Sequence, residues 1–496
     1  MVIADAAQTL PLTMIGPYGA GMALNKDQSA RRFPGPIAPW SAEDLRAALG
    51  WPFPGGGRLG IRLAGGLREL IRSGELPAGT GLPPSRAMAA ALGVSRGVVV
   101  TAYDQLLAEG FLDARQGAGT WVGRVVEPSP GPPSPVPAPV ARPGLPDLGD
   151  FPRNRWLAAY RYALSTASSA DLGYGDPRGH ATLRTELAGH LARTRGVVVD
   201  ADNILITNGV AEGLALLSDV LLADGCGVVA VEDPASPGTR DLLVQRGVEV
   251  VGVPVDDQGM DISRIRGPER LGAIVLTPAH QYPTGVVLSA TRRHALIDLA
   301  RAHGSVLVED DYDGAFRFDR EPVGCLQGLA PDVTVLLGSV SKTLVPALRL
   351  GWLVGPPRLQ ERLVRRRAVT SLAGQTIDQL ALARLLRSGM YDKHVRQMRR
   401  NYHSRRQELI RELTYRNPDI VIKGDNSGLH LLIELPLLTD ELLVLSVLRR
   451  AGFAVQGLSE CRLAAADGGS SGLVIGFASI KAGALAELAE LVSRAC

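Results

Sequence analysis

The sequence predicts a small unit of three helices and a β-hairpin, followed by a large α/β domain with a mostly parallel central sheet and a smaller C-terminal α/β lobe. Three observations support this prediction. A compact helical pattern ends in a glycine-rich hairpin before residue 127, a run of prolines follows, and short apolar runs then alternate with helical stretches from about residue 149. With 496 residues, the chain is long enough for two or three domains.

Changes in composition divide the chain into four predicted segments. Residues 1–57 are rich in Gly, Pro and Ala, and we expect them to be mostly disordered, with a short helix at Ser41–Leu49 capped by Ser41. Residues 58–126 form the small unit. Residues 127–148 form a linker, because EPSPGPPSPVPAPVARPGLP favours extended polyproline geometry. Residues 149–496 form the large domain.

The small unit has the pattern of a helix-turn-helix with a hairpin. Its helices are predicted at about Leu59–Ser73, from Ser85 to Gly93 and from Ser95 to Glu109. The Gly93-Val94 pair makes the tight turn with a buried apolar residue that this motif requires. The following FLDARQGAGTWVG predicts two strands around a glycine-rich tip.

The large domain has apolar β-branched runs that each end in a polar or glycine-rich turn. These runs are NILIT (203–207), GVVAVED (227–233), GAIVLT (272–277), SVLVED (305–310) and DVTVLLGS (332–339). Helical stretches between several of them indicate a mostly parallel sheet covered on both faces. Ligands bind such sheets at the carboxyl ends of the strands. The tail from about Gln375 is predicted to be helical and then α/β.

Charge and cysteine content exclude several classes of protein. The net charge is only +3, so any surface for nucleic acid must be local. The four cysteines lie far apart without a CxxC pair, which argues against a zinc site or a disulfide scaffold, so we expect no metal and a cytoplasmic location. The N-terminus lacks a basic region followed by an apolar run, and no stretch approaches 18 uninterrupted apolar residues; we therefore expect no signal peptide and no membrane span.

The string GSVSKTLVPALRLGW (338–352) follows a predicted strand and contains Lys342, one of only five lysines. A lysine in an apolar site has a lowered pKa, and its neutral amine can form a Schiff base. Arg349, seven residues further on, is placed to clamp a phosphate, with Ser339 and Ser341 as hydroxyl donors.

Two further strings lie at predicted strand ends. In VEDDYDGAFRF (308–318), an aspartate suits a protonated pyridine nitrogen, and a tyrosine two residues later suits a ring oxygen. Standing alone, this string is also compatible with an acidic turn that solvates a strand end. In TNGVAEGLALL (207–217), Gly209 and the amides after it open a helix and make a natural phosphate cradle.

The small unit resembles the GntR family of winged helix-turn-helix regulators over essentially all of residues 58–124. The resemblance rests on LPPSRAMAAALGVSRGVVVTAYDQLLAEG followed by GAGT. It implies that Arg86 and Arg96 contact double-stranded DNA and that Ser95 bonds a phosphate at the start of the recognition helix. Arginine suits this role because its guanidinium fork meets guanine edges or phosphate. The wing would be shaped by Gly117, Gly119 and Thr120.

The strings of the large domain resemble fold-type I aminotransferases. Together with the small unit, the chain resembles the MocR/GabR group of regulators over about residues 40–490. The resemblance implies pyridoxal 5'-phosphate as cofactor, Lys342 as the Schiff-base lysine, Asp310 as the partner of the pyridine nitrogen and Tyr312 as the partner of the ring oxygen. The remaining expected cofactor-binding residues are Arg349, Ser339, Ser341, Gly209, Val210, Ala211 and Tyr282.

Several positions depart from the aminotransferase pattern that the resemblance implies. After Gly209, Ala211 and Glu212 stand where the family commonly has glutamine. Tyr282 stands where those enzymes have the asparagine of Asn-Pro-x-Gly. Ser236, in EDPASPG, stands where the family usually has a tyrosine that packs on the cofactor ring. In SGLVIGFASI, enzymes of this fold carry the arginine that grips the substrate carboxylate at the position that we align with Leu473.

Three functions are compatible with these residues. The leading hypothesis is a transcription regulator that senses an amine, an amino acid or pyridoxal phosphate itself, with at most partial transamination. The alternative is an active aminotransferase with an appended DNA-binding domain, which Leu473 disfavours. The third is a regulator whose large domain only dimerises, which the retained Lys342, Asp310, Tyr312 and Arg349 disfavour. Domains of this fold form dimers, so we expect a homodimer on an operator with two half-sites.

Overall fold

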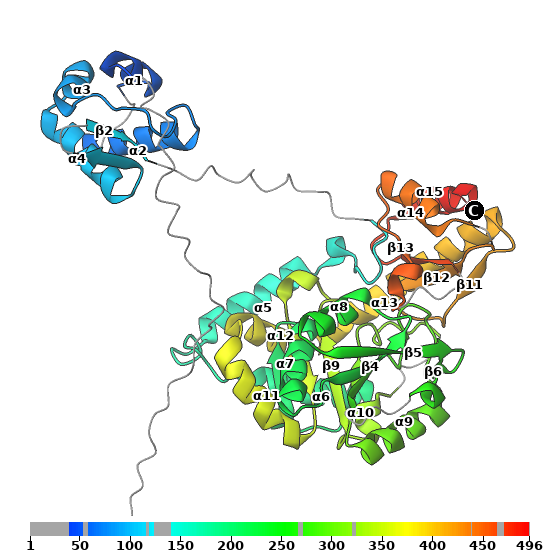
Figure 1. Ribbon diagram of the computed structural model, residues 1–496. Coiled ribbons are helices and arrows are strands. Elements are labelled where there is room, and N and C mark those ends of the chain that lie inside the picture. The colour runs from blue at the N-terminus through cyan, green and yellow to red at the C-terminus, as the bar shows by residue number, and fades with distance from the viewer. Residues whose placement is uncertain are drawn as a thin grey trace, which may run out of the picture. The chain divides into compact units, whose positions relative to one another are not determined.

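The computed structural model divides the chain between Val136 and Pro137 into two compact units, each described here by itself (Figure 1). The structure describes residues 39–52, 58–115, 119–123, 140–265, 271–319, 324–437, 439–463 and 471–495. The expected disorder of residues 1–38 and the linker core at 124–139 lie outside the described residues.

The N-terminal unit has the predicted helix-turn-helix and hairpin. Its elements are α1 (Ala42–Ala48), α2 (Leu59–Arg72), α3 (Ser85–Leu92), α4 (Arg96–Ala108), β1 (Leu112–Arg115) and β2 (Gly119–Val122). Between α3 and α4, Gly93 adopts φ +65°, a left-handed conformation that glycine tolerates best. Val94 then packs against the unit's apolar core. The turn therefore orients α4 as the second helix of the motif.

Helix α1 belongs to the core of this unit, which begins before residue 58. The expected cap is present: the Ser41 side chain accepts a hydrogen bond from the Asp44 amide, and the Asp44 carboxylate bonds the Ser41 amide in return. Leu45 and Leu49 are buried in the same apolar cluster as α2, α3 and α4. The unit thus needs α1 to cover its core, and the N-terminal extension is shorter than the expected 1–57.

The large unit is built on an eight-stranded mixed sheet. Its strands, in spatial order, are β3 (Ile204–Thr207), β10 (Gly351–Val354), β9 (Thr334–Ser339), β8 (Val306–Asp310), β7 (Leu271–Leu276), β4 (Val228–Asp233), β5 (Glu249–Asp256) and β6 (Gly259–Met260). The five predicted strands are present. Because β10 is antiparallel to both β3 and β9, those two strands point the same way. The carboxyl ends of β3, β9, β8, β7 and β4 therefore share one edge.

Side chains that alternate along the strands bury both faces of this sheet. Leu337 and Leu353 point to one face, which α7 (Val210–Ala223), α8 (Pro237–Gln245) and α11 (Pro357–Thr370) cover. Leu336 and Trp352 point to the other, where α5 (Arg153–Thr166), α6 (Ala181–Arg195) and α12 (Thr376–Arg387) pack. Helix α9 (Ala290–His303) extends this second layer over β7 and β8. The sheet is thus the middle of three layers, which leaves its carboxyl edge free to carry a site.

The C-terminal lobe is an antiparallel sheet backed by helices, as the predicted α/β tail requires. Its strands, in spatial order, are β11 (Val421–Lys423), β12 (His430–Glu434), β14 (Gly472–Gly476) and β13 (Gln456–Gly457). The long helix α13 (Met390–Arg416), with α14 (Glu441–Arg450) and α15 (Ala482–Ala495), closes its apolar core (Figure 1).

The end of the expected linker is part of this lobe. Val140 pairs with Phe453 in a parallel bridge, and its carbonyl accepts a hydrogen bond of 2.6 Å from the Ala454 amide. Ala141 is fully buried in the lobe's core, and its carbonyl accepts from the Gly476 amide at 3.0 Å. Residues 140–148 therefore belong to the large unit, which corrects the expected linker end at 148. Backbone pairing overrides the extended, solvated geometry that the prolines indicate.

None of the described helices combines the length and the apolar character needed to cross a lipid bilayer. Cys226, Cys325 and Cys461 are free thiols, the last two buried.

Candidate functional site

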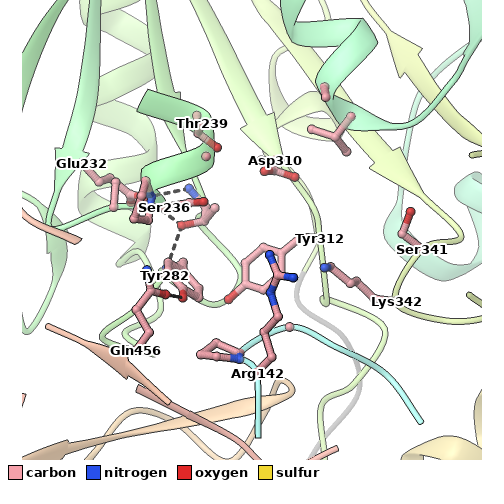
Figure 2. Close-up of a pocket in the computed structure, with 18 of the residues that line it drawn as sticks. Arg142, Glu232, Ser236, Thr239, Tyr282, Asp310, Tyr312, Ser341, Lys342 and Gln456 are labelled. Atoms are coloured by element: carbon pink, nitrogen blue, oxygen red, sulfur yellow. Dashed lines mark hydrogen bonds between the residues drawn. The ribbon is translucent and has the colours of Figure 1, made fainter. Parts of the chain in front are cut away.

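A cavity of about 750 Å³ opens at the carboxyl edge of the large sheet, between the strand ends and the C-terminal lobe (Figure 2). It gathers most of the residues that the sequence analysis selected from separate strings. Those that line it are Val210, Ala211, Tyr282, Asp310, Tyr312, Ser339, Ser341, Lys342 and Arg349. Strand topology explains this gathering, since β3, β7, β8 and β9 end at the same edge.

Lys342 lies in the turn that follows β9, with its side chain half-buried. Burial lowers the pKa of its amine below the ordinary value, and the positive charge of Arg142 acts in the same direction. Asp310 and Asp313 oppose this shift. The environment thus raises the neutral fraction of the amine, the form that attacks a carbonyl carbon.

Asp310 ends β8 with its carboxyl group in the cavity wall. Burial raises the pKa of this carboxyl to about 7, and the nearby Lys342 acts against the rise. Its Oδ1 atom is buried and has no hydrogen-bond partner among the described residues. A buried acceptor of this kind costs stability unless a donor or cation meets it. A protonated pyridine nitrogen would supply both, so the site fits the cofactor that the resemblance implies.

The opposite part of the cavity has the features of a phosphate cradle. Gly209 caps α7 with φ +93°, which leaves the amides at the start of the helix facing outward. A Cβ atom on Gly209 would lie 3.3 Å from Nη2 of Arg349, so glycine allows the guanidinium to approach the backbone. Arg349 donates from Nη2 to the Asn208 carbonyl oxygen at 2.7 Å, which holds it beside α7.

A buried ion pair between Glu212 and Arg367 holds the loop that precedes α7. The Glu212 carboxylate accepts a hydrogen bond from the Asn208 amide and lies 3.6 Å from Nε of the fully buried Arg367. Arg367 also donates to the Pro177 carbonyl oxygen. Glu212 therefore ties the loop before α7 to α11.

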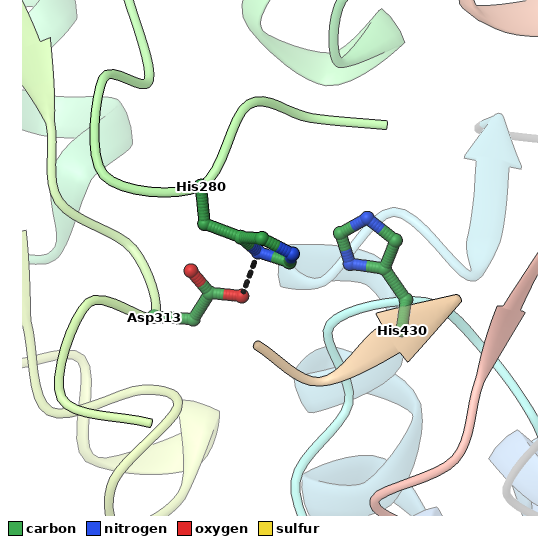
Figure 3. A group of neighbouring side chains, drawn as sticks. All are labelled: His280, Asp313 and His430. Carbon is green, nitrogen blue, oxygen red and sulfur yellow. Dashed lines mark hydrogen bonds and ion pairs between the residues drawn. The ribbon is translucent and has the colours of Figure 1, made fainter. Parts of the chain in front are cut away.

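Tyr312 connects the cavity to a buried group formed by His280, Asp313 and His430 (Figure 3). The Tyr312 hydroxyl donates to the His280 carbonyl oxygen at 3.0 Å and lies 3.0 Å from His280 Nδ1. That same nitrogen is 3.0 Å from Oδ2 of Asp313. The Asp313–His280 pair therefore fixes the position of the Tyr312 hydroxyl.

His430 completes this group from β12. Its Nε2 faces the Pro283 carbonyl oxygen at 3.2 Å, whereas its buried Nδ1 has no partner among the described residues. Burial lowers the pKa of His430 to about 3, so the ring is neutral at physiological pH. The donor atoms of His280, Asp313 and His430 lie within 4.8 Å of one another, a ligand set that zinc accepts. No local pattern in the sequence indicates this group, because the two histidines are 150 residues apart and His280 and Asp313 stand in separate strings.

Three cavity residues were also missed by sequence reasoning. Arg142 comes from the segment before α5, Glu232 from the end of β4 and Gln456 from β13. Glu232 accepts hydrogen bonds from the Thr277 amide and hydroxyl, and burial raises its pKa to about 7. The hydroxyl of Tyr282 donates to Gln456 Oε1, which ties the sheet edge to the C-terminal lobe.

Strand alternation corrects the expected place of the carboxylate-gripping position on β14. Leu473 points into the core of the C-terminal lobe, away from the cavity. Its neighbour Val474 lies in a different cluster, against which the cavity residue Tyr282 packs. Val474 therefore lies on the same side of β14 as Tyr282, but neither Leu473 nor Val474 lines the cavity and neither can bind a carboxylate. Ser236 does line the cavity, at the N-cap of α8, where it offers a hydroxyl in place of an aromatic ring.

The residues expected to contact DNA lie on the surface of the N-terminal unit. Arg86 is exposed in the first turn of α3, and exposed Ser95 is the N-cap of α4. Arg96, at the first position of α4, donates from Nε to the Ser85 hydroxyl at 3.2 Å. Gly119 and Thr120 begin β2, with Gly119 at φ +91°. Gly117 lies outside the described residues.

Comparison with known proteins covers both units. Residues 61–122 match the family "Bacterial regulatory proteins, gntR family", and residues 147–492 match "Aminotransferase class I and II". The chain is 35% identical to the HTH-type pyridoxine biosynthesis transcriptional regulator PdxR of Corynebacterium glutamicum, over 83% of this chain and 90% of that protein. It is 33% identical to the probable rhizopine catabolism regulatory protein MocR of Rhizobium meliloti, over 69% of this chain and 75% of that protein.

Among solved structures, the fold resembles a kynurenine aminotransferase of Pyrococcus horikoshii. The TM-score is 0.65 at 22% identity, over 72% of this chain and 90% of that structure. This likeness shows the fold of the large unit. The two family matches and the two regulator relatives show that the chain belongs to the MocR-type transcription regulators, in which a GntR-family helix-turn-helix is fused to an aminotransferase class I/II domain.

Proposed function

We propose that the protein binds pyridoxal 5'-phosphate at Lys342 and uses the loaded domain to sense an amine, an amino acid or pyridoxal phosphate itself, and so regulates transcription. The observation that carries this proposal is the presence of an amine and a carboxyl group, both partly buried, in one cavity. Lys342 offers an amine with a lowered pKa, and Asp310 offers a carboxyl with an unpartnered oxygen. The α7 amides and Arg349 lie beyond them.

Each group has a distinct task in this proposal. Pyridoxal phosphate supplies an aldehyde that joins a primary amine and a ring that withdraws electrons. Lys342 holds the aldehyde carbon through its amine, and Asp310 keeps a proton on the pyridine nitrogen. Tyr312, positioned by His280, bonds the ring oxygen. Arg349, Ser339 and the first amides of α7 hold the phosphate.

DNA recognition falls to the N-terminal unit. We infer that Arg86 and Arg96 reach base edges or phosphates from α3 and α4, and that the protein acts in the cytoplasm as a homodimer on an operator with two half-sites. A relative named as a pyridoxine biosynthesis regulator supports pyridoxal phosphate as one candidate effector. Sedimentation tests the dimer, and operators with one half-site deleted test the pairing; a monomer, or equal affinity for a single half-site, contradicts it.

A working aminotransferase is the second candidate, favoured by the retained Lys342, Asp310 and Tyr312. Strand β14 argues against it, because neither Leu473 nor Val474 offers a charge to a substrate carboxylate. Conversion of a 2-oxo acid acceptor by the loaded protein would establish transamination.

Borohydride reduction tests the cofactor site. Loaded protein should absorb in the visible range, and reduction followed by peptide mapping should find the cofactor on Lys342. The Lys342→Ala variant should lose the adduct, whereas Lys393→Ala, which removes an exposed lysine on α13, should keep it. An unchanged adduct in Lys342→Ala would reject the assignment.

A further inference from the structure

The segment that follows the proline-rich linker forms one wall of the cofactor cavity. Arg142, Pro143 and Gly144 all line it. Gly144 adopts φ +71°, and a Cβ atom there would lie 3.2 Å from Nζ of Lys342. The chain thus passes against the reactive amine, and Arg142 stands two residues away. In Figure 2 the Arg142 side chain extends from this segment toward the middle of the cavity.

Arg142 differs from the other arginines of the cavity in its partners. Arg349 donates to the Asn208 carbonyl oxygen, and Arg449 pairs with Glu460 at 2.6 Å. No described residue accepts a hydrogen bond or forms an ion pair with the guanidinium of Arg142. The positive charge of Arg142 nevertheless acts on two residues of the cavity. It helps to lower the pKa of Lys342, and it opposes the rise in the pKa of Tyr282 that burial causes. Arg142 is therefore a cation at the mouth of the cavity with its donors available.

Apart from Arg142 and Lys342, the charged donors among the described residues that line the cavity are Arg349 and Arg449, and both already have partners. Tyr282 occupies the position of the enzymes' asparagine, and its hydroxyl is engaged with Gln456. Strand β14 supplies no charge, because Leu473 lies in the lobe's core and Val474 packs in the cluster beside Tyr282. A ligand with an amine near Lys342 and a carboxylate would otherwise leave that carboxylate without a charged partner, which is costly once the cavity excludes water.

We propose that Arg142 binds the carboxylate of an amine ligand that approaches Lys342, so that the protein selects amino acids over simple amines. The inference rests on the proposed function, since the ligand must meet the cofactor at Lys342. A guanidinium matches a carboxylate with two parallel N–H donors, which gives both charge and geometry. Arg142 belongs to the large unit but follows the proline-rich linker closely in sequence, so little chain separates the proposed ligand contact from the segment that leads to the DNA-binding unit.

The test compares acids with their amides. Full-length protein loaded with pyridoxal phosphate is titrated with glycine, β-alanine and 4-aminobutyrate, and with the primary amide of each, while the visible absorbance reports replacement of Lys342. The three acids vary the distance between amine and carboxylate. We expect at least one acid to act at a concentration about tenfold or more below its amide. This factor is the lower end of the roughly 10- to 100-fold expected for hydrogen bonds between charged groups, because Arg142 is exposed.

Variants assign the effect to the residue. Arg142→Gln should raise the half-effective concentration of the preferred acid about tenfold and leave its amide unchanged, and Arg142→Lys should recover part of the preference. Arg449→Gln is the matched control, because that arginine is held by Glu460 at the same cavity; its acid preference should match the wild type. An equal loss for acid and amide in Arg142→Gln would mean a structural role and would overturn the proposal.

Other outcomes separate this inference from the proposed function. Absent visible absorbance in the wild type would reject cofactor binding itself. Normal absorbance with no preference for any acid, or with no response to any of them, would reject the carboxylate site and leave cofactor binding intact. A stronger response to phosphoethanolamine than to all three acids, lost in Arg142→Gln, would overturn the carboxylate assignment in favour of phosphate.

Discussion

Replacing Asp310 with asparagine should stabilise the cofactor-free protein and remove the stabilisation that the cofactor brings. Asp310 is half-buried with its Oδ1 atom buried in the cavity wall, and burial of the carboxyl group raises its pKa from 3.8 to about 7. A carboxyl whose pKa is higher in the folded state than in the unfolded state destabilises the fold once it ionises. The cost is absent below about pH 4, grows as the pH rises to about 7 and stays constant above it.

The size of this cost follows from the two pKa values. With about 1.4 kcal/mol for each pKa unit, the buried carboxyl lowers the free energy of unfolding by about 2 kcal/mol at pH 5 and by about 4 kcal/mol at pH 8. The amide of Asp310→Asn does not ionise. The variant without cofactor should therefore exceed the wild type in stability by an amount that increases by about 2 kcal/mol between pH 5 and pH 8.

Urea unfolding at both pH values measures this difference, with and without pyridoxal phosphate. The cofactor should stabilise the wild type more at pH 8 than at pH 5, because a pyridinium proton pairs with the ionised carboxylate, and Asp310→Asn should lose this gain. Glu309→Gln is the control, because burial also raises the pKa of Glu309 to about 7 but this residue lies on the opposite face of β8, outside the cavity. This variant should keep the stabilisation that the cofactor brings. A cofactor-free Asp310→Asn protein with no pH-dependent advantage would refute the reasoning.

Two further predictions concern the operator and the histidine group. Arg96→Ala should weaken operator binding by about 1–3 kcal/mol in anisotropy titrations at fixed salt. Arg68→Ala is the control and should change binding little, because Glu109 holds this arginine in an ion pair at 2.7 Å. Equal losses in the two variants would mean that Arg96 does not contact the operator. Gly428→Ala should lower the free energy of unfolding by more than about 2 kcal/mol, because its Cβ would lie 2.0 Å from His280 and φ is +77°. Gly389→Ala, with φ +69° and open space around it, should cost only about 1 kcal/mol, and similar costs for both would show that the packing against His280 is not tight.

Local patterns in the sequence predict much of this protein. Helix starts, the Gly93 turn and the five apolar strands depend on residues close together in the chain, so single strings indicate them. Asp310 and Lys342 follow strands of one parallel set, and that topology alone places them at a common edge. The regulator family follows from the same strings.

Tertiary structure decides the features that depend on distant partners. The prolines before Arg142 predict a tether, yet backbone pairing of Val140 with the C-terminal lobe draws the segment into the cavity. The side of β14 that faces Tyr282 depends on register with β12 and β13, since neighbouring residues of a strand point to opposite faces. This alternation puts Val474 rather than Leu473 beside Tyr282. His430 reaches His280 only because the lobe packs on the sheet edge, and such contacts between separate elements leave no periodic signal in the sequence.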